Sequence, residues 1–335
     1  MNELPTDPGD EDTVWRVSSG SATVLGLSDQ RVDVAPTTAY LMLGERCRRN
    51  CAFCAQARAS LAPEGALSRV IWPPFHTGEV VEAVARAHAE GRIQRACFQV
   101  TVTPGHIEAT RRAVERLATR SAVPICASVA PGKVEEVEAL LAAGAQRVTI
   151  ALDAACERVY AQVKGGSWAR TLALLEECAQ RFPGRMGTHL IVGLGETEQE
   201  MALRLQQMAD WGVGVGLFSF TPVAGTPLAG RQPPPLAQYR RMQAARWLIV
   251  QGLDRAEHFR FAAQDGRLVA YGLSRQRLRE VLATGEAFRT SGCPGCNRPY
   301  YNERPSGPLY NYPRPLTPAE AQREIEYLLK SLEYH

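Results

Sequence analysis

Three cysteines, Cys47, Cys51 and Cys54, carry the clearest chemistry in the sequence. They stand in the run GERCRRNCAFC, which directly follows an apolar stretch that favours a β-strand. Thiolates with this Cys-x3-Cys-x2-Cys spacing can surround one corner of a cubane cluster, each binding a different iron. The fourth iron then stays open to a small molecule. A structural zinc site needs a fourth ligand, and neither a cysteine nor a histidine follows soon enough.

A second group of cysteines is spread over the chain. Cys293 and Cys296 flank Pro294-Gly295, and such a knuckle is a common half-site for zinc or iron. Half-sites need another pair of ligands. Cys97 and Cys126 on two expected strands supply that pair if they point inward, although lone strand cysteines are more often small buried hydrophobes. The cysteines at 156 and 178 are interpreted as core or surface residues.

The elements that position these cysteines alternate along the chain. Amphipathic patterns at 134–143, 168–181, 198–211 and 236–251 indicate helices between the strands. This alternation predicts an α/β fold, a (β/α)8 TIM-type barrel with N- and C-terminal extensions, whose active site lies at the carboxyl ends of the strands. The expected strands are 38–43, 95–101, 123–129, 147–152, 187–192, 213–220, 258–262 and 286–290.

Three regions are expected. Residues 1–35 form a partly disordered N-terminal extension, residues 36–296 the barrel, and residues 297–335 a C-terminal segment with a helix. Five prolines and four tyrosines between Pro299 and Pro315 favour an ordered extended loop. The last helix begins at Thr317, with a capping box and a proline at its first position.

Composition narrows the class of protein. The net charge of +3 gives no reason to expect a nucleic-acid partner. No apolar run approaches the length of a membrane span, and the N-terminus lacks the features of a secretory signal. Nine cysteines in such a chain favour metal binding or chemistry in a reducing compartment over disulfides. A cytoplasmic protein that does not bind membranes is expected.

The first cysteine motif, with the aromatic Phe53 before its last cysteine, is similar to the signature of the radical S-adenosylmethionine superfamily. The resemblance implies a [4Fe-4S] cluster whose open iron binds S-adenosylmethionine. It also implies reductive cleavage of that cofactor to a 5′-deoxyadenosyl radical, which removes a hydrogen atom from an unactivated carbon. The electron donor would be a protein such as ferredoxin or flavodoxin.

Residues 38–292 resemble biotin synthase and its relatives, which implies further cofactor-binding residues. Asp153 would hold the cofactor ribose, Arg170 would face the methionine carboxylate, and the backbone at Ile191 and Gly193 would meet the adenine. Phe53 is also expected among the cofactor-binding residues. Each has an ordinary alternative: Asp153 as a helix N-cap, Arg170 as a solvated residue and Gly193 as a turn.

Biotin synthase carries a second cluster held by three cysteines and an arginine. The resemblance places two of these cysteines at Cys97 and Cys126 and the arginine at Arg260. The third cysteine falls on Gly187, and an asparagine that binds the biotin precursor is replaced by Phe218. Both departures argue against biotin formation, and Phe218 is interpreted as part of an apolar wall.

The C-terminal run CPGCNRPYYNERP resembles that of two-component lipoyl synthases, in which two biotin-synthase-like enzymes act together. The resemblance implies sulfur insertion into an octanoyl chain on a lipoyl carrier protein (H protein or lipoyl domain). The sulfur would come from an auxiliary iron–sulfur cluster, and a second radical enzyme would be a partner. An arginine-rich stretch at 274–279 could dock the acidic carrier or be a solvated helix face.

Two other functions stay open at this point. The chain could be another biotin-synthase-like radical enzyme whose second cluster is structural. It could also be a non-catalytic iron–sulfur or zinc protein that senses redox state or scaffolds assembly. Reductive formation of 5′-deoxyadenosine separates the last possibility from both enzymes.

Overall fold

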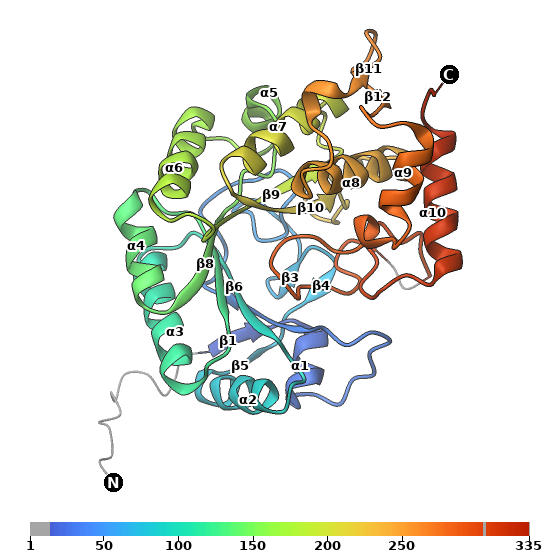
Figure 1. Cartoon of the computed structure of the whole chain (residues 1–335). Helices are drawn as coiled ribbons and strands as arrows, with labels where there is room; N and C mark the ends of the chain where they lie inside the picture. Colours follow the sequence, from blue (N-terminus) through green and yellow to red (C-terminus); the bar gives the residue numbers. More distant parts are fainter. Residues whose placement is uncertain (1–13, 304–305, 335) are drawn as a thin grey trace.

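Six parallel strands form the wall of the fold in the computed structural model, which describes residues 14–303 and 306–334 (Figure 1). Each strand pairs with its neighbour in parallel register. All six residues of β2 are buried, as expected of a parallel strand covered on both faces. The predicted α/β fold is confirmed. The strands are β2 (Thr38–Leu43), β6 (Arg95–Val100), β7 (Ile125–Val129), β8 (Ala145–Ile150), β9 (Met186–Val192) and β10 (Gly214–Ser219).

Two short strands extend the sheet beyond β2. Strand β1 (Val14–Val17) pairs antiparallel with β2, and β5 (Pro74–His76) pairs antiparallel with β1. The resulting order is β10-β9-β8-β7-β6-β2-β1-β5. A small hairpin, β3 (Ala66–Leu67) with β4 (Val70–Ile71), follows the first cysteine loop. The start of the expected N-terminal extension, residues 1–13, lies outside the described residues.

Helices cover the convex side of the sheet (Figure 1), and the four helical patterns of the sequence become α4, α6, α7 and α8. Thr197 and Thr317 each form a capping box, so α7 and α10 begin where the sequence predicts. Within the described ranges no helix is both long and apolar enough to cross a membrane. The α-helices are α1 (Ser19–Leu25), α2 (Thr77–Ala89), α3 (His106–Arg120), α4 (Val134–Ala142), α5 (Glu157–Val163), α6 (Trp168–Arg181), α7 (Glu198–Asp210), α8 (Leu236–Val250), α9 (Arg275–Leu282) and α10 (Pro318–Lys330).

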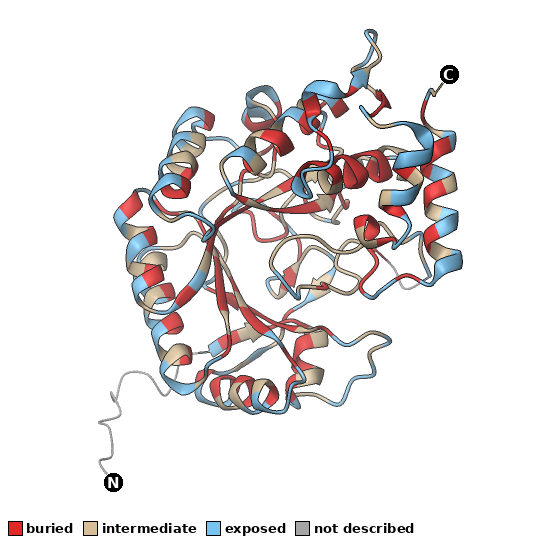
Figure 2. Cartoon of the chain, in the orientation of Figure 1, coloured by how far each residue is buried: buried red, intermediate tan, exposed pale blue. Residues whose placement is uncertain are grey.

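Burial follows this layering. The strands and the sheet-facing sides of the helices are buried, and the outer helix faces are exposed (Figure 2). One continuous apolar cluster joins the helices to the sheet. A separate small cluster around Tyr40, Met42 and Trp72 lies on the concave side, where Cys97 and Cys296 pack against it.

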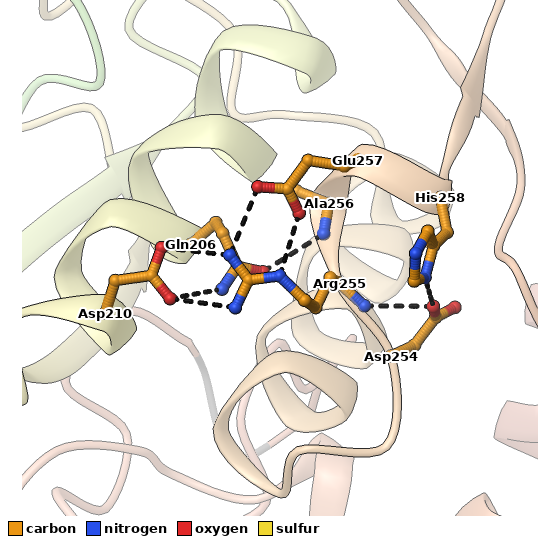
Figure 3. A network of polar contacts seen from close by, with 7 residues as sticks. All are labelled: Gln206, Asp210, Asp254, Arg255, Ala256, Glu257 and His258. Atoms are coloured by element: carbon orange, nitrogen blue, oxygen red, sulfur yellow. Dashed lines mark hydrogen bonds and ion pairs between the residues drawn. The ribbon is translucent and has the colours of Figure 1, made fainter.

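The last two expected strands are wrong. In the segment 258–262 only β11 (Arg260–Phe261) forms, and it pairs with β12 (Leu268–Ala270) in a separate hairpin. The chain just before it is a 3-10 turn, η1 (Ala256–His258), held by polar contacts (Figure 3). Arg255 pairs with Asp210 of α7 at 3.0 Å, and Gln206 of α7 accepts from the Ala256 amide at 3.1 Å. These contacts fix the segment to the outside of α7.

The other expected strand, 286–290, begins with a second 3-10 turn, η2 (Glu286–Phe288). Residues 291–302, here called the closing segment, lie instead between β10 and β2 on the open side of the sheet (Figure 1). Ser291 Oγ accepts from the Leu217 amide of β10 at 2.9 Å, and Asn302 Nδ2 donates to the Ser219 carbonyl at 3.1 Å. The Arg298 amide donates to the Tyr40 hydroxyl of β2 at 2.9 Å. An irregular segment therefore occupies the place where two further strands were expected.

Candidate functional site

A cavity of about 260 Å³ lies inside the curved sheet and brings most of the expected site residues together. Residues of all six parallel strands or their carboxyl ends line this central cavity, as do the first cysteine loop and the closing segment. Arg170, Gly193, Cys47, Cys51 and Cys126 do not line it. The expected site residues that do are Phe53, Cys54, Cys97, Asp153, Ile191, Cys293 and Cys296.

The first cysteine group (Cys47, Cys51 and Cys54) lies on a loop directly after β2, and the loop is braced by its own side chains. Arg46 donates to the carbonyls of Ala55 and Ala62, each at 2.8 Å. The buried Gln56 donates to two carbonyls further along, and its own carbonyl accepts from the Cys47 amide at 2.9 Å. The loop is thereby closed on itself, so the three thiols have fixed positions.

The first group also has the electrostatics of a site that needs a cation. Burial raises the pKa of Cys51 to about 11 and that of Cys54 to about 12, so these thiols stay protonated without a positive partner. Two backbone amides, of Arg49 and Val102, donate to Cys47 Sγ at 3.4 and 3.3 Å. Among the described residues no three acidic, cysteine or histidine side chains gather as for a single metal ion. A cubane binds each thiolate through a different iron and needs no such grouping.

Asp153 follows β8 and is held in the left-handed region, with φ of 65°. Its amide donates to the His189 carbonyl and its carbonyl accepts from the Ile191 amide, both at 2.8 Å, so the backbone continues the pairing with β9. The side chain Oδ2 accepts from Lys164 Nζ at 2.7 Å, and both side chains are mostly buried. Lys164 was missed from the sequence, since a lysine after a helix carries no local signal of such a partner.

The loop after β9 is shaped by a carboxylate. Glu196 accepts from the amides of Gly193 and Leu194 at 2.7 and 3.0 Å. Gly193 has φ of 101°, and a Cβ there would come within 2.9 Å of Pro234, so a glycine is required. Ile191 alone of the two predicted backbone positions lines the cavity. Arg170 is exposed on α6, where it donates to the Gly132 carbonyl at 3.4 Å.

The second cysteine group (Cys97, Cys126, Cys293 and Cys296) is assembled from three distant parts of the chain. Cys97 of β6 and Cys126 of β7 are direct register partners. The sulfurs of Cys126 and Cys293 are 3.3 Å apart, and Cys296 Sγ lies 3.2 Å from the Tyr40 hydroxyl. The knuckle turns tightly, because the Cys296 amide donates to the Cys293 carbonyl at 3.1 Å.

Asn297 anchors the knuckle to the sheet. Its Oδ1 accepts from the Thr37 amide at 3.0 Å, and its Nδ2 donates to the Ala35 carbonyl at 2.9 Å. The Thr290 hydroxyl donates to the Asn297 carbonyl at 2.6 Å. The Asn297 side chain thus has a structural partner for both its acceptor and its donor.

Arginines surround the second group, and they are not the one expected. Arg95 of β6 donates to Cys126 Sγ at 2.8 Å and to the Pro294 carbonyl at 3.1 Å. Arg260 lies on β11 and donates to the Glu333 carbonyl, so its expected place beside the cysteines is wrong. The hydrogen bond from Cys126, followed by nearby arginines, lowers the pKa of Cys293 to about 6, while the same contact raises that of Cys126.

The wall opposite the second group is aromatic and carries a charge. Phe218 meets His189 and Tyr301 edge to face, with ring centroids 5.0 Å and 5.9 Å away. The Arg298 guanidinium lies 3.8 Å from the Phe218 centroid, so the wall expected to be apolar is capped by a cation. Burial lowers the pKa of His189 to about 4, which leaves its imidazole neutral.

Gly187 stands at the position of the missing third cysteine, between the adjacent strands β8 and β10. A Cβ at this glycine would lie 2.8 Å from Thr149 Oγ1. Because that separation is too short for a real Cβ, a cysteine there would require the Thr149 side chain to move. Gly187 therefore leaves open a part of the central cavity that a larger side chain would fill.

The arginine-rich stretch forms the start of α9, and some of its charge is paired. Arg277 pairs with Glu280 at 3.1 Å, and Arg279 pairs with Glu326 of α10 at 2.8 Å. Carrier docking on this helix stays a prediction.

Comparisons with known proteins agree with this site. The sequence profile of the Radical SAM superfamily matches residues 41–207, which contain the first cysteine group, Cys97 and Cys126. Lipoyl synthase from Haemophilus ducreyi is 26% identical over 182 residues, 53% of this chain and 53% of that protein. The chain thus spans about half the length of the curated relative that it matches.

Two solved structures share the fold. The FeFe-hydrogenase maturase HydG from Carboxydothermus hydrogenoformans aligns with a TM-score of 0.52 at 14% identity, covering 88% of this chain and 78% of that one. Methylornithine synthase aligns with a TM-score of 0.50 at 14% identity, covering 72% and 71%. At such identities the likeness concerns the fold alone. The profile match, together with the three braced cysteines, identifies the chain as a member of the radical S-adenosylmethionine superfamily.

Proposed function

We propose that this enzyme inserts sulfur into an octanoyl chain carried on a lysine of a lipoyl carrier protein, as a component of a lipoyl synthase. The observation that carries the proposal is the meeting of both cysteine groups at one cavity. Cys54 of the first group and Cys97, Cys293 and Cys296 of the second all line it. A carbon activated beside one group would therefore lie near the other.

The first group fits a [4Fe-4S] cluster by its donor set, since three fixed thiols leave one iron open for S-adenosylmethionine. Together the cluster and the cofactor supply a radical able to remove hydrogen from an unactivated carbon. The chain's own residues orient the cofactor and exclude water. Asp153, whose Oδ2 is held by Lys164, is suited to a ribose hydroxyl, and Ile191 offers an apolar surface to the adenine.

The second group fits an auxiliary cluster as the sulfur donor. Four thiols provide a full ligand set, and their negative charge as thiolates needs compensation in a buried site. Arg95 contacts Cys126 directly, and Arg147 and Arg298 lower the pKa of Cys293. Burial raises the pKa of Cys97 and Cys296, and the arginines oppose that effect, in the direction of the ionised sulfurs that iron binding requires.

The substrate class rests on the similarity to lipoyl synthase and on the cavity lining. Phe218, Phe220 and Val223 contribute apolar surface there. Burying a methylene contributes roughly 0.8 kcal/mol, so an eight-carbon chain gains much of its binding from such walls. Dethiobiotin, the biotin precursor, carries a polar ring, which gains less from these apolar walls than an alkyl chain does. An electron-donor protein and a second radical enzyme remain proposed partners.

One observation favours a second candidate, a radical enzyme with a structural metal at the second group. The 3.3 Å between the sulfurs of Cys126 and Cys293 suits two ligands of one tetrahedral ion, and Cys97 and Cys296 would have to move closer to complete it, since no three ligands gather among the described residues. Metal analysis decides between them: zinc or a single iron at this group would leave no sulfur to donate.

The proposal is tested by product mass. Protein reconstituted anaerobically with iron and isotopically labelled sulfide is incubated with S-adenosylmethionine, dithionite, and either an octanoyl-lysyl peptide or dethiobiotin. We expect labelled sulfur on the octanoyl chain and none on dethiobiotin. A Cys293→Ala/Cys296→Ala variant should still form 5′-deoxyadenosine but transfer no sulfur. Sulfur on dethiobiotin alone, or on neither molecule, would overturn the substrate assignment while leaving the superfamily intact.

A further inference from the structure

A second cavity, of about 240 Å³, lies beside the central one and is here called the side cavity. The two cavities share four lining residues: Tyr40, Trp72, Arg298 and Tyr301. These side chains form a partition with a cavity on each side. The proposed function uses only the central cavity, so the side cavity requires its own explanation.

The two cavities are open to the surface to a similar degree but differ in the residues at their rims. None of the residues that line the central cavity is exposed, whereas Arg31 and Asp33 of the side cavity are. Between that mouth and the partition, the side-cavity walls are largely apolar, with Val34, Pro36 and Val70 among them. The side cavity is therefore a path from the surface to the partition, with walls suited to a slender aliphatic group.

The partition holds two N–H donors that have no acceptor among the described residues. Trp72 is 1% exposed, and its Nε1 is buried without a hydrogen-bond partner. The same holds for Nε of Arg298, although its Nη2 donates to the Ser291 carbonyl at 2.8 Å. Buried donors of this kind are normally paired, so their position on a partition between two cavities indicates a ligand acceptor.

We propose that the side cavity admits an N-acyl-lysine arm and that Trp72 Nε1 and Arg298 Nε bind its amide carbonyl at the partition. This inference rests on the proposed function and names the recognition step within it. The lysine methylenes would lie along the valine and proline walls, and the acyl chain would continue into the central cavity. A free fatty acid could place its carboxylate at the same donors, but it would leave the side cavity unfilled.

Trp72→Phe tests the carbonyl contact, because it removes the donor and keeps an aromatic ring in the partition. The probes are a fluorescent octanoyl-lysyl peptide and the same peptide with a neutral alkene in place of the amide. Both are titrated into the reconstituted holoenzyme with S-adenosylmethionine. One hydrogen bond corresponds to about a three- to tenfold change in Kd. We expect Trp72→Phe to weaken the amide peptide by that factor and to leave the alkene peptide unchanged.

Trp247→Phe is the matched control. Trp247 on α8 also has a buried, unpartnered Nε1, but it lines neither cavity. The control should bind both peptides as the wild type does. Iron content and thermal unfolding of each variant show that the comparison concerns folded protein.

Gly20→Leu tests the path itself. Gly20 is the second residue of α1 and lines the side cavity, and a Cβ there would meet Pro36 at an ordinary 3.6 Å. The helix tolerates leucine, but its side chain would narrow the passage, so we expect Kd for the peptide to rise about tenfold or more. Free octanoate is titrated as a second ligand, and it should bind more weakly than the peptide because it leaves the side cavity unfilled. Gly78→Leu, at the same position of α2 and away from both cavities, is the control.

The outcomes separate this inference from the proposed function. Peptide binding that Trp72→Phe and Gly20→Leu leave untouched overturns the inference, even if sulfur is transferred normally. Peptide binding weakened by both variants, with no sulfur in any product, supports the inference and overturns the proposed reaction. Octanoate that binds as tightly as the peptide, or a wild type that binds no peptide, shows that the arm is not the ligand and sinks the inference.

Discussion

The two cysteine groups differ in how the chain brings them together. The first lies on one short loop that its own residues Arg46 and Gln56 brace. The second joins two strands to a segment far along the chain, which Asn297 anchors to residues before β2. Local bracing makes the first group readable from the sequence, although its loop also bonds to Val102, Val163 and Leu228 elsewhere in the fold. The second group exists only if the closing segment docks.

The difference has an energetic side. A loop closed over a few residues loses little chain entropy, whereas joining distant segments requires the whole fold to form first. The second group also needs Arg95, Arg147 and Arg298 to offset its charge, and these come from three separate elements. Substitutions in the second group should therefore leave the first group intact. Whether substitutions in the first group disturb the second depends on the cavity that the two groups share.

The largest effect is expected from the first group. Replacing Cys47, Cys51 or Cys54 by alanine leaves two thiols and no site for productive cofactor binding. We expect 5′-deoxyadenosine formation from S-adenosylmethionine and dithionite to fall to background in each variant, as measured by chromatography. Wild-type rates in any of them would mean that the motif does not hold the radical cluster. Cys156→Ala/Cys178→Ala, a pair outside both groups, is the control and should keep full activity.

The comparison is sharpened by removing the knuckle. With two cubane clusters the reconstituted wild type binds about eight irons, and Cys293→Ala/Cys296→Ala should bind about four while still cleaving the cofactor. The iron and acid-labile sulfide contents are measured chemically, and the clusters of the reduced protein are observed by electron paramagnetic resonance. A wild type with about four irons, or with zinc at the knuckle, would contradict a sulfur-donating cluster.

Two asparagines allow a crossed experiment. Asn297→Ala removes the anchor of the knuckle, whereas Asn50→Ala removes a 3.0 Å contact with the Ala59 amide inside the first loop. Asn297→Ala removes the partners that a buried side chain provides, at about 1–3 kcal/mol, whereas the exposed Ala59 amide can bond water instead, so the effect of Asn50→Ala is smaller. We expect Asn297→Ala to reduce second-cluster occupancy alone and Asn50→Ala to affect cofactor cleavage alone. If both variants change both readouts equally, the groups are not independent.

The smallest effect concerns His189, which belongs to neither group but faces the shared cavity. Its pKa is lowered to about 4 in the folded protein, so between pH 6.5 and 4 only the unfolded chain takes up the proton. Stability is therefore lost as the pH falls through this window, by about 2 kcal/mol at pH 5 relative to pH 7. Urea unfolding of the apoprotein measures it.

His189→Gln should remove that part of the pH dependence, and His76→Gln, at an exposed position, should not. An unchanged pH slope in His189→Gln would show that the imidazole titrates normally in the folded protein.

The sequence predicts the parts of the molecule that local patterns specify. The capping box at Thr317 places α10 correctly, and the apolar run at Thr38–Leu43 places β2. The superfamily and the first cysteine group follow from one contiguous motif. The sequence predicts that Cys97 and Cys126 meet the knuckle only if both point inward. Strand periodicity does not say which distant segment covers a strand.

The errors have physical causes of the same kind. The segments 258–262 and 286–290 have strand-like composition, but tertiary contacts override it, such as the buried hydrogen bond from the Ala256 amide to Gln206 just before the first segment. Arg260 was placed by analogy, whereas the arginine that meets Cys126 is Arg95, whose direction depends on β6. Lys164 could have been suspected only from the need of a buried Asp153 for a cation.

The place of the closing segment also sets an order of events during synthesis. Both the first loop and the strands that carry Cys97 and Cys126 leave the ribosome well before residues 291–302. The radical-generating half can thus mature while two buried-strand thiols still await the knuckle that pairs with them. Iron delivered too early would meet an unfinished ligand set.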